Sequence, residues 1–291
     1  MKSHIRNKDI VFPDSTLIKT TKETFAEYLI YINHPQIEFP NNISFEFFNG
    51  FQHSGEPYGA FYLPNEFNEH YTLRLEQVHT LNKNKESLYH EFTHIMDYIV
   101  LNSHLSFEEI KQLKFIAEVR AKYIECCTRM DFINAFENHK ITYNSLIKSK
   151  FSKKPLSINE ELSNYNELLF NKISLFNNVL SSLDYQDLLK FLYYYIGFIT
   201  FIEKNSETEI NTSQITELLK PIMGESVIDF FNIRKNIPLN FSNIDKNLLL
   251  ETIQIIHNII PNKFLTISIL NIVKKNNVVY ILIILKFYSL N

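Results

Sequence analysis

The chain has 291 residues, of which 45% are hydrophobic and 21% are charged, and its formal net charge at pH 7 is -3. A chain of this length can bury a large core, as one two-lobed domain or as two small ones. The slightly negative charge gives no electrostatic argument for nucleic-acid binding. With 5 glycines and no GxGxxG or GxxxxGK pattern, the sequence also offers no phosphate-cradling loop.

The start of the chain and its cysteines bear on the compartment in which the protein works. Residues 1–6 contain no apolar stretch of the kind that a secretory signal peptide needs. Cys126 and Cys127 are adjacent, so they cannot form an ordinary disulfide with each other, and free thiols fit a reducing compartment. We therefore expect the protein to be cytoplasmic, or to be exported without a cleavable signal peptide.

The region before residue 80 combines one predicted helix with several strands. Thr20 and Glu23 form a capping pattern that opens a helix, and this helix is predicted to run to about Asn33. Alternating and apolar runs predict three strands, at 43–47, 58–63 and 71–78.

The most informative feature is the run His90-Glu91-Phe92-Thr93-His94, which spells HExxH. Composition alone would produce this pattern in roughly two such chains per hundred. Residues 86–102 contain no glycine or proline, and their apolar residues recur at helical spacing, so the run is predicted to lie on a helix. His90, Glu91 and His94 fall off the apolar stripe, on a neighbouring polar face.

The spacing within this run suits a zinc site. Histidines at positions i and i+4 stand one turn apart on one helix face, so His90 and His94 can bind the same metal ion. Glu91 would then lie beside the open position of the metal, where it can take a proton from bound water. Asp97 follows on the same helix, but three ligands in a row would not easily close a tetrahedron. We interpret Asp97 as a residue that orients a ligand or serves the structure.

A third protein ligand is expected downstream, because catalytic zinc usually has three protein ligands and a water molecule. Glu109 is better explained as the capping partner of Ser106 at the start of a second helix. Glu118 interrupts an apolar face of that helix, and a buried carboxylate is costly unless it is paired or binds a metal. We predict Glu118 as the ligand, although a salt bridge to Lys122 would also explain it. The other candidates are His104, Glu108, Glu125, and a histidine or aspartate elsewhere.

The HExxH run and the segment Phe115-Ile116-Ala117-Glu118-Val119-Arg120-Ala121 together resemble the gluzincins, zinc peptidases with HExxH on one helix and a Glu ligand on the next. Residues 90–98 also look like the motif helix of the anthrax lethal factor family. The Glu-x-x-Ala spacing is equally similar to phage-repressor-cleaving metallopeptidases. The resemblance covers roughly residues 58–125. Thermolysin-like gluzincins carry an Asp four residues after the Glu ligand, and here that position is Lys122.

The resemblance implies a zinc metallopeptidase that hydrolyses peptide bonds in a protein or peptide substrate, with Zn²⁺ as its cofactor. A bacterial effector or toxin-like protease would be one such enzyme. Zincins place an edge strand shortly before the motif helix, and the substrate pairs with that strand. Gly59, Ala60 and Phe61 are the candidate residues for this strand, and a hairpin packed on the helices is the alternative.

The oxyanion formed during hydrolysis needs a second donor besides the metal. The sequence does not rank the candidates, which are Tyr143, Tyr165, the run Tyr193 to Tyr195, Arg129 and Arg234. Two other classes of function stay open: a binding protein whose zinc site is structural or vestigial, and a helical scaffold without metal.

The predicted fold class is α+β and mostly α, with a small antiparallel or mixed sheet, the motif helix and a helical C-terminal half. We place the boundary between two subdomains at 1–104 and 105–291. The helices of the second half are predicted at roughly 107–137, 158–182, 185–204, 212–222 and 246–259. The apolar runs 264–273 and 278–287 are too short to span a bilayer, so no transmembrane segment is expected. The oligomeric state is left open.

Overall fold

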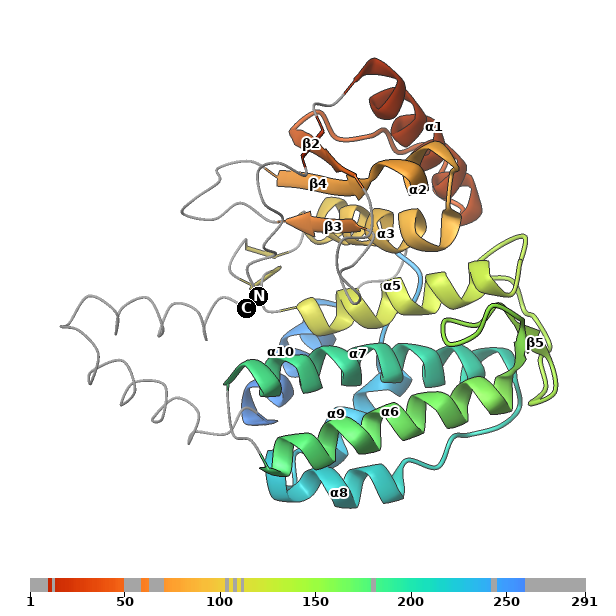
Figure 1. Ribbon diagram of the computed structural model, residues 1–291. Helices are drawn as coiled ribbons and strands as arrows, with labels where there is room; N and C mark the ends of the chain where they lie inside the picture. The colour runs from red at the N-terminus through yellow and green to blue at the C-terminus, as the bar shows by residue number, and fades with distance from the viewer. Residues whose placement is uncertain are drawn as a thin grey trace. The chain divides into compact units, whose positions relative to one another are not determined.

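The structure is a computed structural model (Figure 1) that describes residues 10–11, 14–49, 59–62, 71–102, 105–106, 109–110, 113–178, 182–241 and 245–259. Most of these residues are helical, and the strands form a four-stranded sheet and a two-stranded sheet. The predicted α+β, mostly α class is therefore confirmed.

The chain divides into two compact units, and each unit is formed by two segments. Unit 1 comprises Met1–Ile99 and Ala121–His139, and unit 2 comprises Val100–Arg120 and Lys140–Asn291. Helix α5 (Lys114–Arg129) is continuous across the junction, so its first part is counted in unit 2 and its second part in unit 1. The predicted boundary at residue 104 stays a prediction.

Unit 1 contains a mixed sheet. Its strands are β1 (Ile10–Val11), β2 (Ile43–Phe48), β3 (Gly59–Tyr62) and β4 (Tyr71–Glu76). The strand order is β1-β2-β4-β3, in which β2 and β4 are parallel and the two outer strands are antiparallel to their neighbours. The three predicted strands are confirmed, and β3 lies at one end of the described sheet, as an edge strand should.

Side-chain caps set the ends of two elements in unit 1. The Asp14 carboxylate accepts a hydrogen bond from the backbone N–H of Leu17 at 2.7 Å, so α1 (Ser15–Tyr31) begins there. The Glu76 carboxylate accepts one from the backbone N–H of His79 at 2.6 Å, so β4 ends and α2 (Gln77–Leu81) begins. The predicted helix start at Thr20 and strand end at Val78 are therefore wrong, because both caps lie earlier in the chain.

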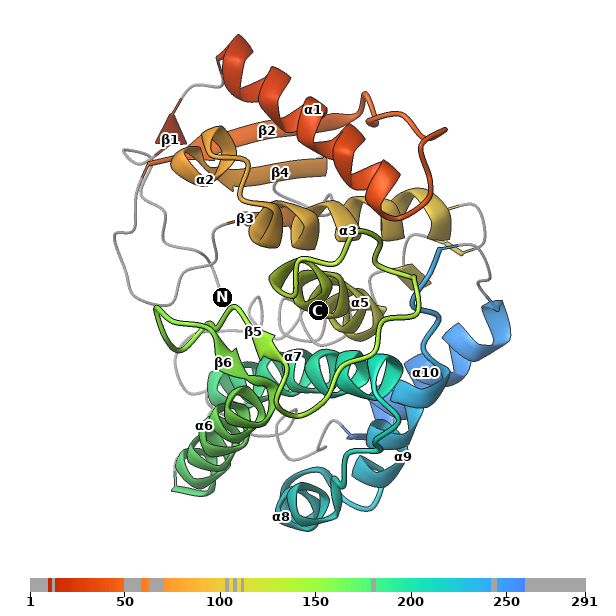
Figure 2. The same cartoon turned by 90° about the vertical axis from the view of Figure 1, so that its right-hand side faces the viewer.

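Figure 2 shows the backbones of α1 and α3 (Lys85–Leu101), the helix that carries HExxH. A cluster of aromatic side chains joins these two helices. The centroid of the Phe92 ring lies 5.2 Å from that of Phe25 and 5.8 Å from that of Tyr28. The Tyr28 hydroxyl donates a hydrogen bond to the Thr93 hydroxyl at 3.0 Å. The two variable residues of HExxH are thus part of the core, and this packing leaves the histidines on another face of α3.

Unit 2 is built mainly from helices. After α5, the strands β5 (Leu146–Ile147) and β6 (Leu156–Ser157) form a short antiparallel pair. The next elements are α6 (Ile158–Asn178), α7 (Ser182–Asn205), α8 (Ser213–Met223), α9 (Val227–Asn232), the 3-10 helix η2 (Ile233–Asn236) and α10 (Lys246–Ile259). Helices α6 and α7 lie side by side, and buried residues of α7 such as Leu192 and Ile196 explain its apolar sequence as that of a core helix.

The predicted helices of this half agree with the structure within a few residues, with one exception. The helix predicted at 107–137 is wrong in its extent, since α5 covers Lys114–Arg129 and ends before Asp131. Asp131 adopts a left-handed backbone conformation with φ of 58°, which terminates the helix. The short helix α9 was not predicted, and the apolar runs 264–273 and 278–287 lie outside the described residues. No helix in the described part of the chain is long and apolar enough to cross a membrane.

We expect Phe92→Ala to lower the free energy of unfolding by about 3–5 kcal/mol, because it empties a fully buried position in the aromatic cluster. Urea titration followed by circular dichroism measures this change. Ile133→Ala is the control, since Ile133 is 87% exposed and surface substitutions usually change stability by about 0.5 kcal/mol or less. Equal effects of the two substitutions would contradict the placement of Phe92 in the core.

Candidate metal centre

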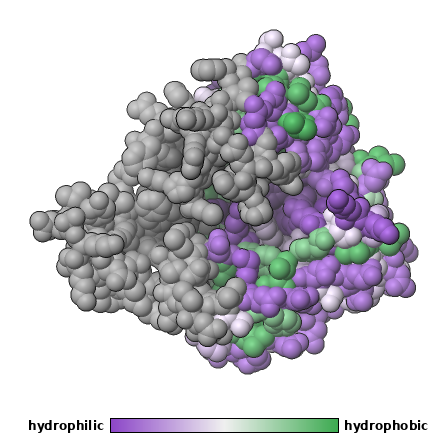
Figure 3. Space-filling model, in the orientation of Figure 1, coloured by the Kyte–Doolittle hydropathy of each residue, from purple (hydrophilic) through white to green (hydrophobic). Residues whose placement is uncertain are grey.

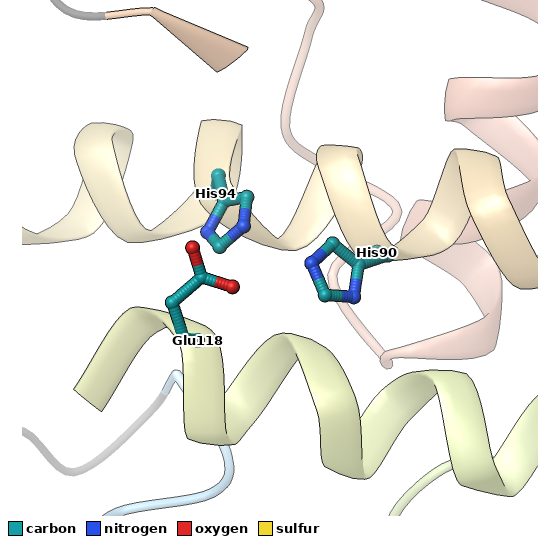
Figure 4. A group of neighbouring side chains, drawn as sticks. All are labelled: His90, His94 and Glu118. Carbon is teal, nitrogen blue, oxygen red and sulfur yellow. The ribbon is translucent and has the colours of Figure 1, made fainter. Parts of the chain in front are cut away.

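The two histidines of HExxH project from one face of α3 (Figure 4). The ring centroids of His90 and His94 are 5.1 Å apart, and the ring planes are inclined at 82°. Both side chains are half-buried, whereas Phe92 and Thr93 between them are fully buried. The histidines therefore stand at the margin of the core, where a metal ligand can bind an ion that water also reaches.

Glu118 approaches the histidines from α5 (Figure 4). Ligand atoms of His90, His94 and Glu118 all lie within 4.8 Å of one another. Tetrahedral zinc with bonds of about 2.0–2.2 Å needs ligand atoms about 3.4 Å apart, so small side-chain rotations would close the site. Glu118 lies less than one turn before Ala121, where the continuous helix α5 enters unit 1. The three predicted ligands are thus brought together.

A second carboxylate of α5 lies beside the first histidine. Glu125 Oε2 is 3.4 Å from His90 Nδ1, and Glu125 is 3% exposed. Its Oε1 atom accepts a hydrogen bond from Lys122 Nζ at 2.7 Å and lies 3.8 Å from a guanidinium nitrogen of Arg129. A carboxylate that accepts a hydrogen bond from the Nδ1–H group of a histidine leaves the Nε2 atom of that ring available to a metal.

This contact supplies an orienting partner for His90 that the sequence does not reveal. Thermolysin-like gluzincins have an Asp four residues after the Glu ligand; here Lys122 occupies that position and binds Glu125. Glu118 and Glu125 are seven residues apart, so they share one face of α5 about two turns apart. From the sequence, Glu125 is a candidate only as a metal ligand. The i, i+7 spacing of the two carboxylates is the signal that could have paired them with the two histidines.

Glu91, the predicted general base, lies against the edge strand β3. A Cβ atom added to Gly59 would be 2.7 Å from Glu91 Cγ and 3.1 Å from a methyl carbon of Leu75. A side chain at Gly59 would therefore collide with the predicted base. Glu91 is only 7% exposed, so the backbone of β3 forms part of its cover.

The other residues predicted for the site lie nearby in unit 1. Asp97 is 4% exposed and follows His94 on α3, but it is not a member of the three-residue ligand group. Ala60 and Phe61 continue β3 from Gly59 and are half-buried. The Phe61 ring stacks on that of Tyr71, with centroids 5.9 Å apart, which holds the edge strand to β4.

The alternative third ligands have separate explanations or fall outside the described residues. The Glu109 carboxylate accepts hydrogen bonds from the Ser106 backbone N–H at 2.7 Å and from its hydroxyl at 2.8 Å, which confirms the predicted capping box. These bonds hold the pKa of Glu109 below its ordinary value. His104 and Glu108 lie outside the residues that the structure describes.

Among the candidate oxyanion donors, Tyr193 has an electrostatic interaction with Glu118. Burial raises the pKa of the Tyr193 hydroxyl, and the negative charge of Glu118 raises it further. The Tyr193 ring also packs on Phe115, with centroids 5.1 Å apart, and Phe115 precedes Glu118 by one turn of α5. The guanidinium of Arg234 instead donates two hydrogen bonds of 3.0 Å to Glu203.

Comparisons of the chain with protein-family models, with curated proteins and with solved structures gave no match. The interpretation of the site therefore rests on its own residues. Those residues form a possible metal-binding group of two imidazoles and one carboxylate, with a further carboxylate behind His90.

We expect Glu125→Gln to weaken zinc binding by about 10–100-fold, because it removes the charge that orients His90. Competition with a chromophoric chelator measures the affinity. Glu161→Gln is the matched control, since Glu161 is also fully buried and its carboxylate accepts a 2.7 Å hydrogen bond from Ser149, in unit 2. Both variants should lose stability, but only the first should lose zinc affinity. Equal zinc affinity in wild type and Glu125→Gln would show that Glu125 does not orient a ligand.

Proposed function

We propose that this protein is a zinc-dependent peptidase that hydrolyses peptide bonds in a protein substrate. The observation that carries the proposal is the convergence of His90, His94 and Glu118, with ligand atoms within 4.8 Å, beside a buried Glu91. Two imidazoles and one carboxylate are the ligands of several catalytic zinc sites, which keep a fourth position for water. Among the described residues the ligand group has three members, and this number favours a catalytic site over a closed structural one.

The metal ligands and Glu91 would have different roles in hydrolysis. A zinc ion held by the three ligands would act as a Lewis acid and lower the pKa of a water molecule to about 7. The Glu91 carboxylate would accept a proton from that water and later deliver it to the nitrogen of the leaving amine. Its burial beneath β3 limits the access of bulk water and keeps the carboxylate close to the edge strand.

The substrate backbone would pair with β3. This strand ends the described sheet and is antiparallel to β4, so its other edge can accept a further strand. Gly59 supports this role, because the absence of a side chain lets the backbone of β3 lie directly on Glu91. A scissile peptide bound along β3 would then be close to the base.

Tyr193 is the second oxyanion donor in this proposal. Its buried hydroxyl belongs to the same helical unit as Glu118 and interacts with that carboxylate electrostatically. A tyrosine hydroxyl is protonated at neutral pH and can therefore donate a hydrogen bond. The binding-protein alternative, with a structural or vestigial zinc site, requires no such donor.

Glu91→Gln should abolish hydrolysis and leave zinc bound, because the amide keeps the shape of the side chain but cannot accept the proton. The measurement is the mass-spectrometric detection of new peptide termini after incubation with a complex peptide library, with zinc content determined in parallel. Glu86→Gln, also on α3, is the control and should cleave like wild type. New termini of equal abundance with Glu91→Gln, or none with the zinc-loaded wild type, would contradict the proposed reaction.

Tyr193→Phe should lower kcat by about 100-fold or more, because one oxyanion donor is lost, and should leave KM and zinc affinity unchanged. Steady-state kinetics on a cleaved library peptide tests this. Tyr123→Phe is the control, since Tyr123 is also buried and its hydroxyl donates a 3.1 Å hydrogen bond to the carbonyl of Ala135. A loss of kcat that is equal in the two variants would remove Tyr193 from the mechanism.

A further inference from the structure

Asp131 and Glu137 lie in the first part of the segment between α5 and α6, and positive charge is concentrated in the part that follows. Residues 140–158 contain five lysines and no aspartate or glutamate, in a chain whose net charge is -3. We call residues 140–158 the basic hairpin, because they include the paired strands β5 and β6. All of its lysines are exposed: Lys140, Lys148, Lys150, Lys153 and Lys154.

Apolar side chains are exposed among these lysines. Leu146 is 64% exposed, Phe151 is 40% exposed and Tyr143 is 37% exposed. Single exposed apolar residues are ordinary, but a group of them among lysines within one short segment forms an amphipathic surface. Figure 3 shows hydrophobic side chains next to hydrophilic ones on the side of the molecule where Figure 1 labels β5.

The basic hairpin is anchored to unit 2. The backbone N–H of Ile158 donates to the carbonyl of Ser145 at 2.9 Å, and the Ser149 hydroxyl donates to the buried carboxylate of Glu161 at 2.7 Å. The Phe151 ring packs edge-on against Tyr165, with centroids 5.1 Å apart. These contacts fix the backbone that displays the lysines, so binding there would require little further ordering of the chain.

We propose that the basic hairpin binds the surface of an anionic lipid membrane. The ammonium groups of the lysines would contact lipid headgroups, and Leu146 would enter the interfacial region. Clusters of four to eight basic residues with apolar neighbours are typical of such surfaces. Protein–protein interfaces are instead enriched in arginine and depleted in lysine, and residues 140–158 contain no arginine. Binding of nucleic acid would use the lysines but gives no role to the aliphatic Leu146.

Sedimentation of the full-length, zinc-loaded protein with lipid vesicles tests the proposal. We expect binding to phosphatidylcholine vesicles that contain about 30% phosphatidylserine, and none to pure phosphatidylcholine. Each lysine near such a surface strengthens binding about fivefold, so Lys153→Gln with Lys154→Gln should weaken it by about 25-fold. Leu146→Ser should weaken binding without a change in charge.

The matched control is Lys19→Gln with Lys246→Gln, which removes the same charge from exposed lysines outside the basic hairpin. This control should bind the anionic vesicles like wild type, and circular dichroism and zinc content should be unchanged in all variants. The proposal is overturned by equal binding to both vesicle types, by no binding to either, or by equal losses in the two double variants. Binding of single-stranded DNA or heparin without vesicle binding would also overturn it, in favour of a polyanionic macromolecule.

Discussion

The contact between His90 on α3 and Glu125 on α5 is the interaction on which the candidate site depends. Glu125, Lys122 and Arg129 are buried, and buried charges are strongly destabilising unless they are paired. The contacts of Glu125 with Lys122 and Arg129 lie within α5 and compensate its charge, while its contact with His90 on α3 restrains the rotation of α5 about its own axis. Because Glu118 lies on the same face of α5, the rotation that satisfies Glu125 also directs Glu118 toward the histidines.

The orientation of α3 has a separate cause in the aromatic core of unit 1. Phe92 and Thr93 are held by rings and a hydroxyl of α1, so the helix cannot turn without exposing them. This leaves the histidines at the margin of the core and places Glu91 beneath β3, where only a glycine fits. Apolar packing and buried charge thus act on different helices, and both are needed for the ligand group to form.

Much of this site can be predicted from the sequence, because the positions of its residues follow from short-range spacing along single helices. The spacing of HExxH places both histidines on one helix face, and the carboxylate in an apolar context distinguishes Glu118 from its neighbours. The resemblance to zincins makes residues 59–62 the candidate edge strand, and β3 does lie at one end of the described sheet. What the sequence could not reveal is tertiary: the pairing of Glu125 with His90 depends on the rotation of α5. Two helix ends also differ from the prediction. The first helix begins earlier because Asp14 caps it, and α5 ends earlier because Asp131 adopts a left-handed backbone conformation.

The central claim is that two histidines and Glu118 hold a zinc ion whose fourth position is open to water. X-ray absorption at the zinc edge, on protein purified without added metal, tests it most directly. The account predicts about one zinc per chain, with two imidazole nitrogens and two oxygens at about 2.0–2.2 Å, and loss of this signal in Glu118→Ala. A protein without zinc, or a zinc ion with four protein ligands that persists in Glu118→Ala, would contradict it.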